Sequence, residues 1–156
     1  MRSAPHSRKL KINRQPGRPA GASTVMRQCL LDAAVALFAE RGAEATTLRA
    51  ICAQAGVTPG LLHYYFSNKE ALIDALLKER IAPLVAISSA PLIAQDLDPL
   101  QALIQFLRSH IENIASHPWL PPLIVREVIG SGILRDRILA QTTGAIAARL
   151  DRKSVV

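Results

Sequence analysis

The sequence predicts an all-α fold, and three observations support this prediction. Ala and Leu are abundant while only 4% of the residues are aromatic, a composition that favours helices over sheets. Apolar residues recur at the three- and four-residue spacing of a helix face along most of the chain. Residue types that begin and end helices stand between these periodic segments. We therefore expect a chain of helices without a strand.

Positive charge is concentrated in the first 22 residues. The formal net charge is +7; residues 1–22 contain six basic and no acidic side chains, whereas residues 23–150 contain 11 of each. Pro and Gly are frequent in the same stretch, so we expect residues 1–22 to form a flexible basic arm. Such an arm suits a polyanion partner, although a solubilising tail has the same composition.

Several classes of protein lack support in this sequence. No apolar run reaches the roughly 18 residues of a membrane span, and no secretory signal is present, so the cytoplasm is the expected location. Cys29 and Cys52 show no metal-binding spacing, and buried small hydrophobes are their simplest interpretation. No phosphate loop or catalytic spacing is found, so we expect neither an enzyme nor a cofactor.

The first helix is predicted over residues 23–41. Apolar residues at i, i+3, i+4, i+7 and i+8 form its buried face, and Gly42 follows as the C-terminal cap. These residues are Leu30, Ala33, Ala34, Leu37 and Phe38.

Two short helices follow. The first covers residues 47–54, with Thr46 or Thr47 as its N-cap, and Gly56 permits the tight turn after it. The second begins at Thr58 and Pro59, an N-cap followed by a first-turn proline, and runs to about residue 65.

A fourth helix is predicted from Ser67, which forms a capping box with Glu70, and Pro83 should bend or end it. Helical periodicity resumes near Pro99, breaks at residues 117–118, and continues over 119–129. Residues 130–132 form a loop, and a last helix covers about 133–150.

The two short helices joined by a glycine turn form a helix-turn-helix. The first helix of such a pair braces the second, so that the second can enter the major groove of DNA. The spacing alone fits a helical hairpin without a ligand equally well.

The residue types distinguish these two interpretations. Residues 46–49 (TTLR) and 55–72 (AGVTPGLLHYYFSNKEAL) resemble the signature of the TetR/AcrR family of regulators. The resemblance extends without a gap over about residues 30–77, with Cys52 in place of a usual Ala and His63 in place of a usual Tyr. It implies a DNA-binding domain over residues 23–80 and part of a ligand-binding and dimerisation domain over 81–150.

The resemblance further implies a ligand-responsive repressor that binds a palindromic DNA operator as a homodimer, with an unknown small-molecule effector. The alternative is a helical ligand-binding or protein-interaction module that does not bind DNA. Four features favour the DNA-binding regulator over this alternative: the intact helix caps, the Gly56 turn, Lys69 and the basic arm.

Candidate DNA contacts lie on and around the second short helix. Pro59, Gly60 and Leu61 form its leading turn, where Gly60 allows close backbone approach and Leu61 can contact a thymine methyl. Arg49 is a candidate for a guanine or phosphate contact. Side chains with a hydroxyl, imidazole or ammonium group, or at a helix N-terminus, are candidates for phosphate; these are Thr47, Thr58, His63, Tyr64, Tyr65 and Lys69.

Arg18 lies in a Gly-Arg-Pro tripeptide that resembles a minor-groove hook, because a Pro-flanked Arg can enter a narrow A·T-rich groove. Residues of mixed polarity in the later helices are candidates for lining an effector pocket. These are Phe106, His110, His117, Trp119 and Glu127.

The resemblance implies about two more long helices than the chain contains, so we expect the native protein to be longer. Residues 151–156 (DRKSVV) are what a common sequencing-library adapter encodes, and we expect them to be a non-native tail. Without the dimer helices, apolar helix faces should be exposed.

Overall fold

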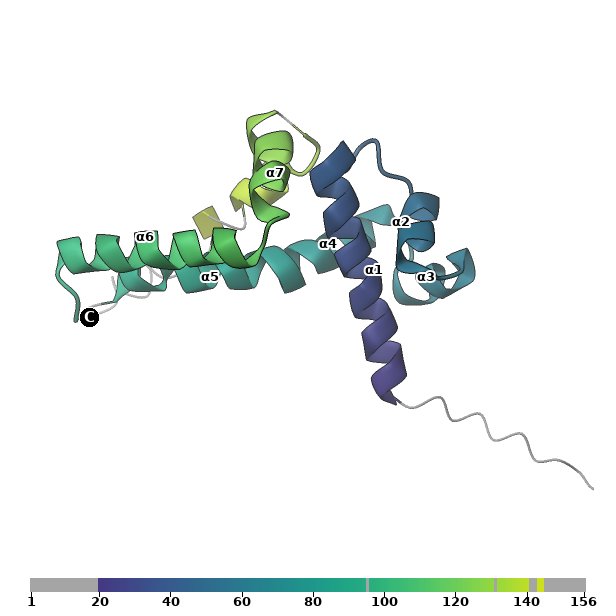
Figure 1. The fold of residues 1–156 in the computed structure, drawn as a ribbon, viewed down its shortest axis with the longest axis horizontal. Helices are drawn as coiled ribbons and strands as arrows, with labels where there is room; N and C mark the ends of the chain where they lie inside the picture. Colours follow the sequence, from purple (N-terminus) through teal and green to yellow (C-terminus); the bar gives the residue numbers. More distant parts are fainter. Residues whose placement is uncertain (1–19, 95, 131, 141–142, 145–156) are drawn as a thin grey trace, which may run out of the picture.

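The computed structural model describes residues 20–94, 96–130, 132–140 and 143–144. Arg18 with most of the expected arm, and residues 151–156, therefore lie outside the described residues. Helices joined by short turns make up the described part, with no strand in it, which confirms the all-α prediction (Figure 1). The elements are α1 (Ala20–Arg41), α2 (Leu48–Ala55), α3 (Pro59–Tyr65), α4 (Lys69–Leu76), η1 (Leu77–Ile81), α5 (Ala82–Ser89), η2 (Ala90–Ile93), α6 (Pro99–Ser116), α7 (Leu120–Ile124) and η3 (Val125–Ile129).

Helix α1 forms the centre of the N-terminal half. Its five predicted core residues are all buried, and Leu30, Ala34 and Phe38 have no exposed surface. Helices α2, α3, α4 and α7 all pack on α1. Gly42 ends the helix with φ +88°, a left-handed conformation that glycine adopts without steric cost.

The predicted caps of α2 and α3 are present. The Thr47 hydroxyl accepts a hydrogen bond from Ala50 N at 3.1 Å, and the Thr58 hydroxyl accepts one from Leu61 N at 3.4 Å. Gly56 has φ +65° and turns the chain between the two helices. Thr46, the other candidate cap, is buried and donates its hydroxyl to Gly42 O at 2.7 Å.

The capping box predicted for the fourth helix is wrong. Asn68, not Ser67, is the N-cap of α4, and its Oδ1 accepts a hydrogen bond from Ala71 N at 2.8 Å. Asn and Ser serve equally well as N-caps. The helix begins one residue later than predicted, so Glu70 falls in its first turn, one position short of the place a capping box requires.

Pro83 does not end the fourth helix, contrary to one of the two outcomes we expected. Helical backbone continues from Lys69 through η1, a single π-helical turn, and α5 to Ser89. Pro83 stands in the first turn of α5, immediately after the π-helical turn. Wider turns of this kind accommodate local breaks in the hydrogen-bond ladder, which allows a continuous helical rod to connect the two halves of the molecule (Figure 1).

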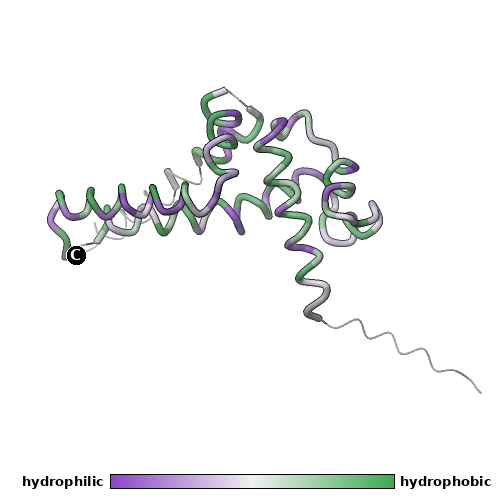
Figure 2. Tube along the Cα trace, in the orientation of Figure 1, coloured by the Kyte–Doolittle hydropathy of each residue, from purple (hydrophilic) through white to green (hydrophobic). Residues whose placement is uncertain are grey.

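Helix α6 runs back alongside α5 and packs against it (Figure 1). Asn113 is buried there and donates to Leu84 O at 3.1 Å and to Ser88 Oγ at 2.7 Å. Apolar residues recur along the whole helix (Figure 2), and many of them are exposed. The exposed ones are Leu100, Leu103, Ile104, Leu107, Ile111 and Ile114.

The segment α7–η3 returns to the N-terminal half and packs on α1. Glu127 of η3 is 1% exposed, and both of its carboxylate oxygens accept hydrogen bonds from backbone N–H groups. Ala43 N donates at 2.7 Å and Leu134 N at 3.1 Å. Among the described residues, no helix combines the length and the hydrophobicity needed to cross a membrane.

Candidate nucleic-acid interface

The leading turn of α3 is presented to solvent. Thr58, Pro59 and Gly60 are exposed, whereas Leu62, on the opposite face, is completely buried against the core. A Cβ atom built on Gly60 would meet nothing within 4 Å, so open space lies directly in front of this backbone. One buried leucine thus anchors the helix while its N-terminal turn stays accessible.

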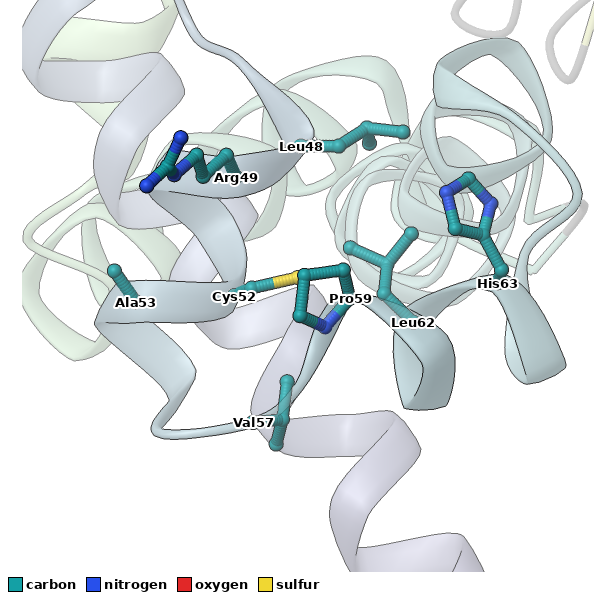
Figure 3. Close-up of a pocket in the computed structure, with 8 residues that line it drawn as sticks. All are labelled: Leu48, Arg49, Cys52, Ala53, Val57, Pro59, Leu62 and His63. Carbon is teal, nitrogen blue, oxygen red and sulfur yellow. The ribbon is translucent and has the colours of Figure 1, made fainter.

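A hollow lies between α2 and α3, beside this leading turn (Figure 3). Pro59 and Leu62 line it from α3, and Cys52 lines it from α2. Burial raises the pKa of the Cys52 thiol, which keeps it neutral. The rest of the lining comes from Leu48, Arg49, Ala53, Val57 and His63.

Arg49 and His63 are the polar side chains that line this hollow (Figure 3). Both side chains are exposed. Within the described part of the chain, Arg49 makes no salt bridge or hydrogen bond that would occupy its guanidinium group. A guanidinium in this position can form a bidentate hydrogen bond with a guanine edge or a phosphate.

The two tyrosines at the end of α3 differ in environment. Tyr64 is 75% exposed, whereas Tyr65 is half-buried and its hydroxyl is 3.0 Å from Ser23 Oγ of α1. Their rings pack edge to face with centroids 5.0 Å apart, and Tyr65 also packs against the buried Phe66 at 6.5 Å. The Tyr64 hydroxyl is therefore the more accessible of the two predicted phosphate contacts.

Lys69 and Thr47 stand at the N-terminal ends of α4 and α2. The Lys69 ammonium group donates to Glu44 O at 3.1 Å, which fixes it over the loop that precedes α2. An ammonium group has three donor hydrogens, so donors remain for a phosphate. Thr47 is exposed, and its hydroxyl oxygen caps α2.

Sequence reasoning missed an ionic and aromatic cluster beneath the tyrosines. Arg27 of α1 forms two hydrogen bonds of 2.6 Å with the carboxylate of Glu79 in η1, and its guanidinium carbon lies 5.1 Å from the centre of the Phe66 ring. Gln28 Nε2 donates to the same carboxylate at 3.3 Å. The hydrogen bonds from Arg27 are the main cause that lowers the pKa of Glu79. Arg27 and Glu79 are 52 residues apart, and no local pattern relates them.

The residues predicted to line an effector pocket lie on three separate segments: α6, the turn before α7, and η3. Phe106 and His110 stack on one another on α6, with ring centroids 5.7 Å apart. Trp119, half-buried against the core, packs edge to face on His117 at the turn before α7. Both carboxylate oxygens of Glu127 already accept hydrogen bonds from backbone N–H groups, those of Ala43 and Leu134. Among the described residues, no cluster of three or more metal-ligating side chains occurs.

Comparisons with known proteins all find similarity to bacterial transcriptional regulators. Residues 30–76 match the family model described as bacterial regulatory proteins, tetR family. The HTH-type transcriptional regulator RutR of Escherichia coli (strain K12) is 32% identical over 143 residues, which cover 90% of this chain and 64% of that protein.

Two further relatives match a shorter part of the chain. The HTH-type transcriptional repressor KstR2 of Mycobacterium tuberculosis (strain ATCC 25618 / H37Rv) is 36% identical over 100 residues, covering 64% of this chain and 50% of the relative. The HTH-type transcriptional regulator BetI of Rhizobium meliloti (strain 1021) is 33% identical over 87 residues, covering 54% and 43%. The matched parts of the chain thus cover between 43% and 64% of the length of these relatives.

Proposed function

Because the chain belongs to the TetR family of bacterial regulatory proteins, we propose that it is a transcriptional repressor that binds operator DNA through α3. One observation carries this proposal: the exposed Thr58–Gly60 turn, which has open space in front of Gly60 and a buried Leu62 behind it. A helix presented in this way fits the major groove with its N-terminal residues towards the base edges.

We assign the contacts according to the accessibility of each side chain. Gly60 and Leu61 approach the bases, and neither offers a bidentate hydrogen-bond pair, so Arg49 is the main candidate for reading a guanine. Tyr64 and His63 contact phosphates on one side of α3. The remaining phosphate contacts come from helix N-termini, namely Thr47, Thr58 and Lys69.

The proposal includes a homodimer and a small-molecule effector. Repression is supported by the relatives, one of which is named a repressor. Two copies with recognition helices about 34–36 Å apart would read successive major grooves of a palindromic operator. Phe106 and His110 on α6, and Trp119 just before α7, are candidates for contacting the effector. Arg18 is a candidate for a minor-groove contact.

Fluorescence anisotropy tests the DNA-binding proposal. The chain is titrated against duplexes from the DNA flanking its own gene and against a scrambled duplex, over about 50–200 mM salt. We expect affinity for one flanking duplex to exceed that for the scrambled one, with a log–log salt slope of about −0.9 per phosphate contact. Absence of binding, or binding that does not respond to salt, would contradict the proposal.

Arg49→Ala and Arg108→Ala form a matched pair for the same assay. Each removes one exposed cation, but Arg108 lies on α6, in the other half of the molecule. Loss of Arg49 should weaken binding by about 1–3 kcal/mol if it contacts a guanine. The Arg108 variant should bind like the wild type. Equal effects of the two substitutions would show that only overall charge matters.

A further inference from the structure

Arg27 connects three segments that are far apart in the sequence. Arg27 lies on α1, its guanidinium group is bound by Glu79 of η1, and its guanidinium carbon lies over the ring of Phe66, the residue directly after α3. Ser23, one helical turn before Arg27, contacts the Tyr65 hydroxyl. One face of α1 therefore holds both the end of α3 and the π-helical turn in the middle of the rod that leads to the other half.

The guanidinium group is fixed in orientation and is not available to a ligand. Each of its two terminal nitrogens donates to a different oxygen of Glu79, the bidentate arrangement that restricts both groups most strongly. The side chains of Arg27 and Glu79 are each 30% exposed, so solvent screens this pair less than a fully exposed one. A cation at 5.1 Å from an aromatic centre adds an attraction to Phe66.

The aromatic contacts continue from Phe66 to the surface. Phe66 packs on Tyr65, and Tyr65 packs on Tyr64, the exposed tyrosine that we assign to a phosphate. We propose that Arg27 is a positioning residue for DNA binding: held by Glu79, it keeps Phe66, and through it Tyr65 and Tyr64, in the orientation that the phosphate contacts need. The inference rests on the proposed function.

Two substitutions separate this role from an effect of charge. Glu79→Gln removes a negative charge, so simple attraction to DNA would become stronger, whereas loss of the bidentate pair should weaken binding. Arg27→Lys keeps the positive charge but cannot form the bidentate pair or stack as a plane. A positioning role therefore predicts weaker DNA binding in both variants. An effect of charge alone predicts tighter binding by Glu79→Gln and no change in Arg27→Lys.

Asp32→Asn is the matched control. The carboxylate of Asp32 binds Arg80, so this pair also joins α1 to η1, with a shortest distance of 2.6 Å, but the structure gives it no aromatic contact. Asp32 is 66% exposed, and exposed pairs contribute little. We expect binding about tenfold weaker for the Arg27 and Glu79 variants, as for loss of a charge-assisted hydrogen bond, and within about twofold of wild type for the control. The salt slope should be unchanged in every variant, because the disturbed contact is made by the uncharged Tyr64 hydroxyl, which neutralises no phosphate charge.

A measurement on the free protein keeps this inference distinct from the proposed function. The chain contains only two tyrosines, so ring-labelled tyrosine gives two sets of NMR signals, from Tyr64 and Tyr65. Both sets should shift in Glu79→Gln and Arg27→Lys and stay in place in Asp32→Asn. Urea unfolding establishes that each variant is folded.

The outcomes divide as follows. If the wild type binds DNA, unchanged or tighter binding by Glu79→Gln overturns the inference and leaves the proposed function intact. If the wild type does not bind DNA, the proposed function fails; the tyrosine signals then decide alone, and signals unmoved by both variants overturn the positioning role.

Discussion

Replacing Gly60 with Ala should affect stability and DNA binding in opposite directions. Gly60 lies in the first turn of α3, and a Cβ atom there would touch nothing within 4 Å. The free protein therefore gains only the better helix propensity of alanine, about 0.5 kcal/mol near a helix end. With a typical urea dependence, this raises the unfolding midpoint by roughly 0.2–0.5 M.

The same methyl group should obstruct the complex with DNA. If the backbone of Gly60 packs against base edges at van der Waals distance, about 3.5–4.0 Å, an added carbon forces the helix to retreat by roughly an ångström. Hydrogen bonds to phosphate stretch beyond their useful range of about 3.2 Å. Loss of one or two of them costs about 1–3 kcal/mol, or ten- to hundredfold in affinity.

Gly144→Ala provides the control for this experiment. Gly144 is also helical and also has open space around its Cβ position, but it lies far along the chain from α3. Urea unfolding and fluorescence anisotropy are measured for both variants. A Gly60→Ala protein that is stabilised and yet binds DNA as tightly as wild type would refute the close backbone approach.

Three further predictions concern stability and use urea unfolding. Glu79→Gln should destabilise the protein at neutral pH, and the difference from wild type should shrink as pH falls below about 4, because the pKa of Glu79 is lowered in the folded state and its stabilisation is lost on protonation. Glu127→Gln should cost about 1–3 kcal/mol, since an amide nitrogen would face the N–H of Ala43 or Leu134, and a difference below 0.5 kcal/mol would contradict this. Phe38→Ala should cost about 3–5 kcal/mol, because the side chain is completely buried, and a stability like that of wild type would show that the site refills.

Local features of the fold were predictable from the sequence because their causes are local. The N-caps Thr47 and Thr58 and the left-handed Gly56 act within a few residues. The structure has Thr58 and Gly56 as predicted, and of the two candidates Thr46 and Thr47 it uses Thr47. At the start of α4, two adjacent residues can both cap a helix, and local reasoning chose Ser67 where the structure uses Asn68. Helix existence was therefore more predictable than helix boundaries.

Features that depend on distant residues were not predictable. The π-helical turn η1 places Glu79 against Arg27 and Arg80 against Asp32 of α1, and nothing within a helical window of the sequence signals it. The environment of Glu127 was not predictable for the same reason. From the sequence we interpreted this acidic residue as a candidate for lining an effector pocket, but its hydrogen-bond partners are backbone N–H groups 84 and 7 residues away. The candidate DNA interface was easier to predict from the sequence, because α2 and α3 follow one another directly along the chain.

The buried carboxylate of Glu127 occupies space that is left free because two neighbouring residues, Gly42 and Gly132, have no side chain. A Cβ on Gly132 would overlap its Oε2 and lie 2.7 Å from its Cδ, and a Cβ on Gly42 would approach its Oε1 to 3.4 Å. Alanine at Gly132 would also place its Cβ 2.8 Å from the backbone Cα of Glu127, so a shorter residue at position 127 would not make room for it. In a library of functional variants, position 132 should therefore remain glycine even where residue 127 has changed, because the obstruction lies in the backbone and not only in the side chain.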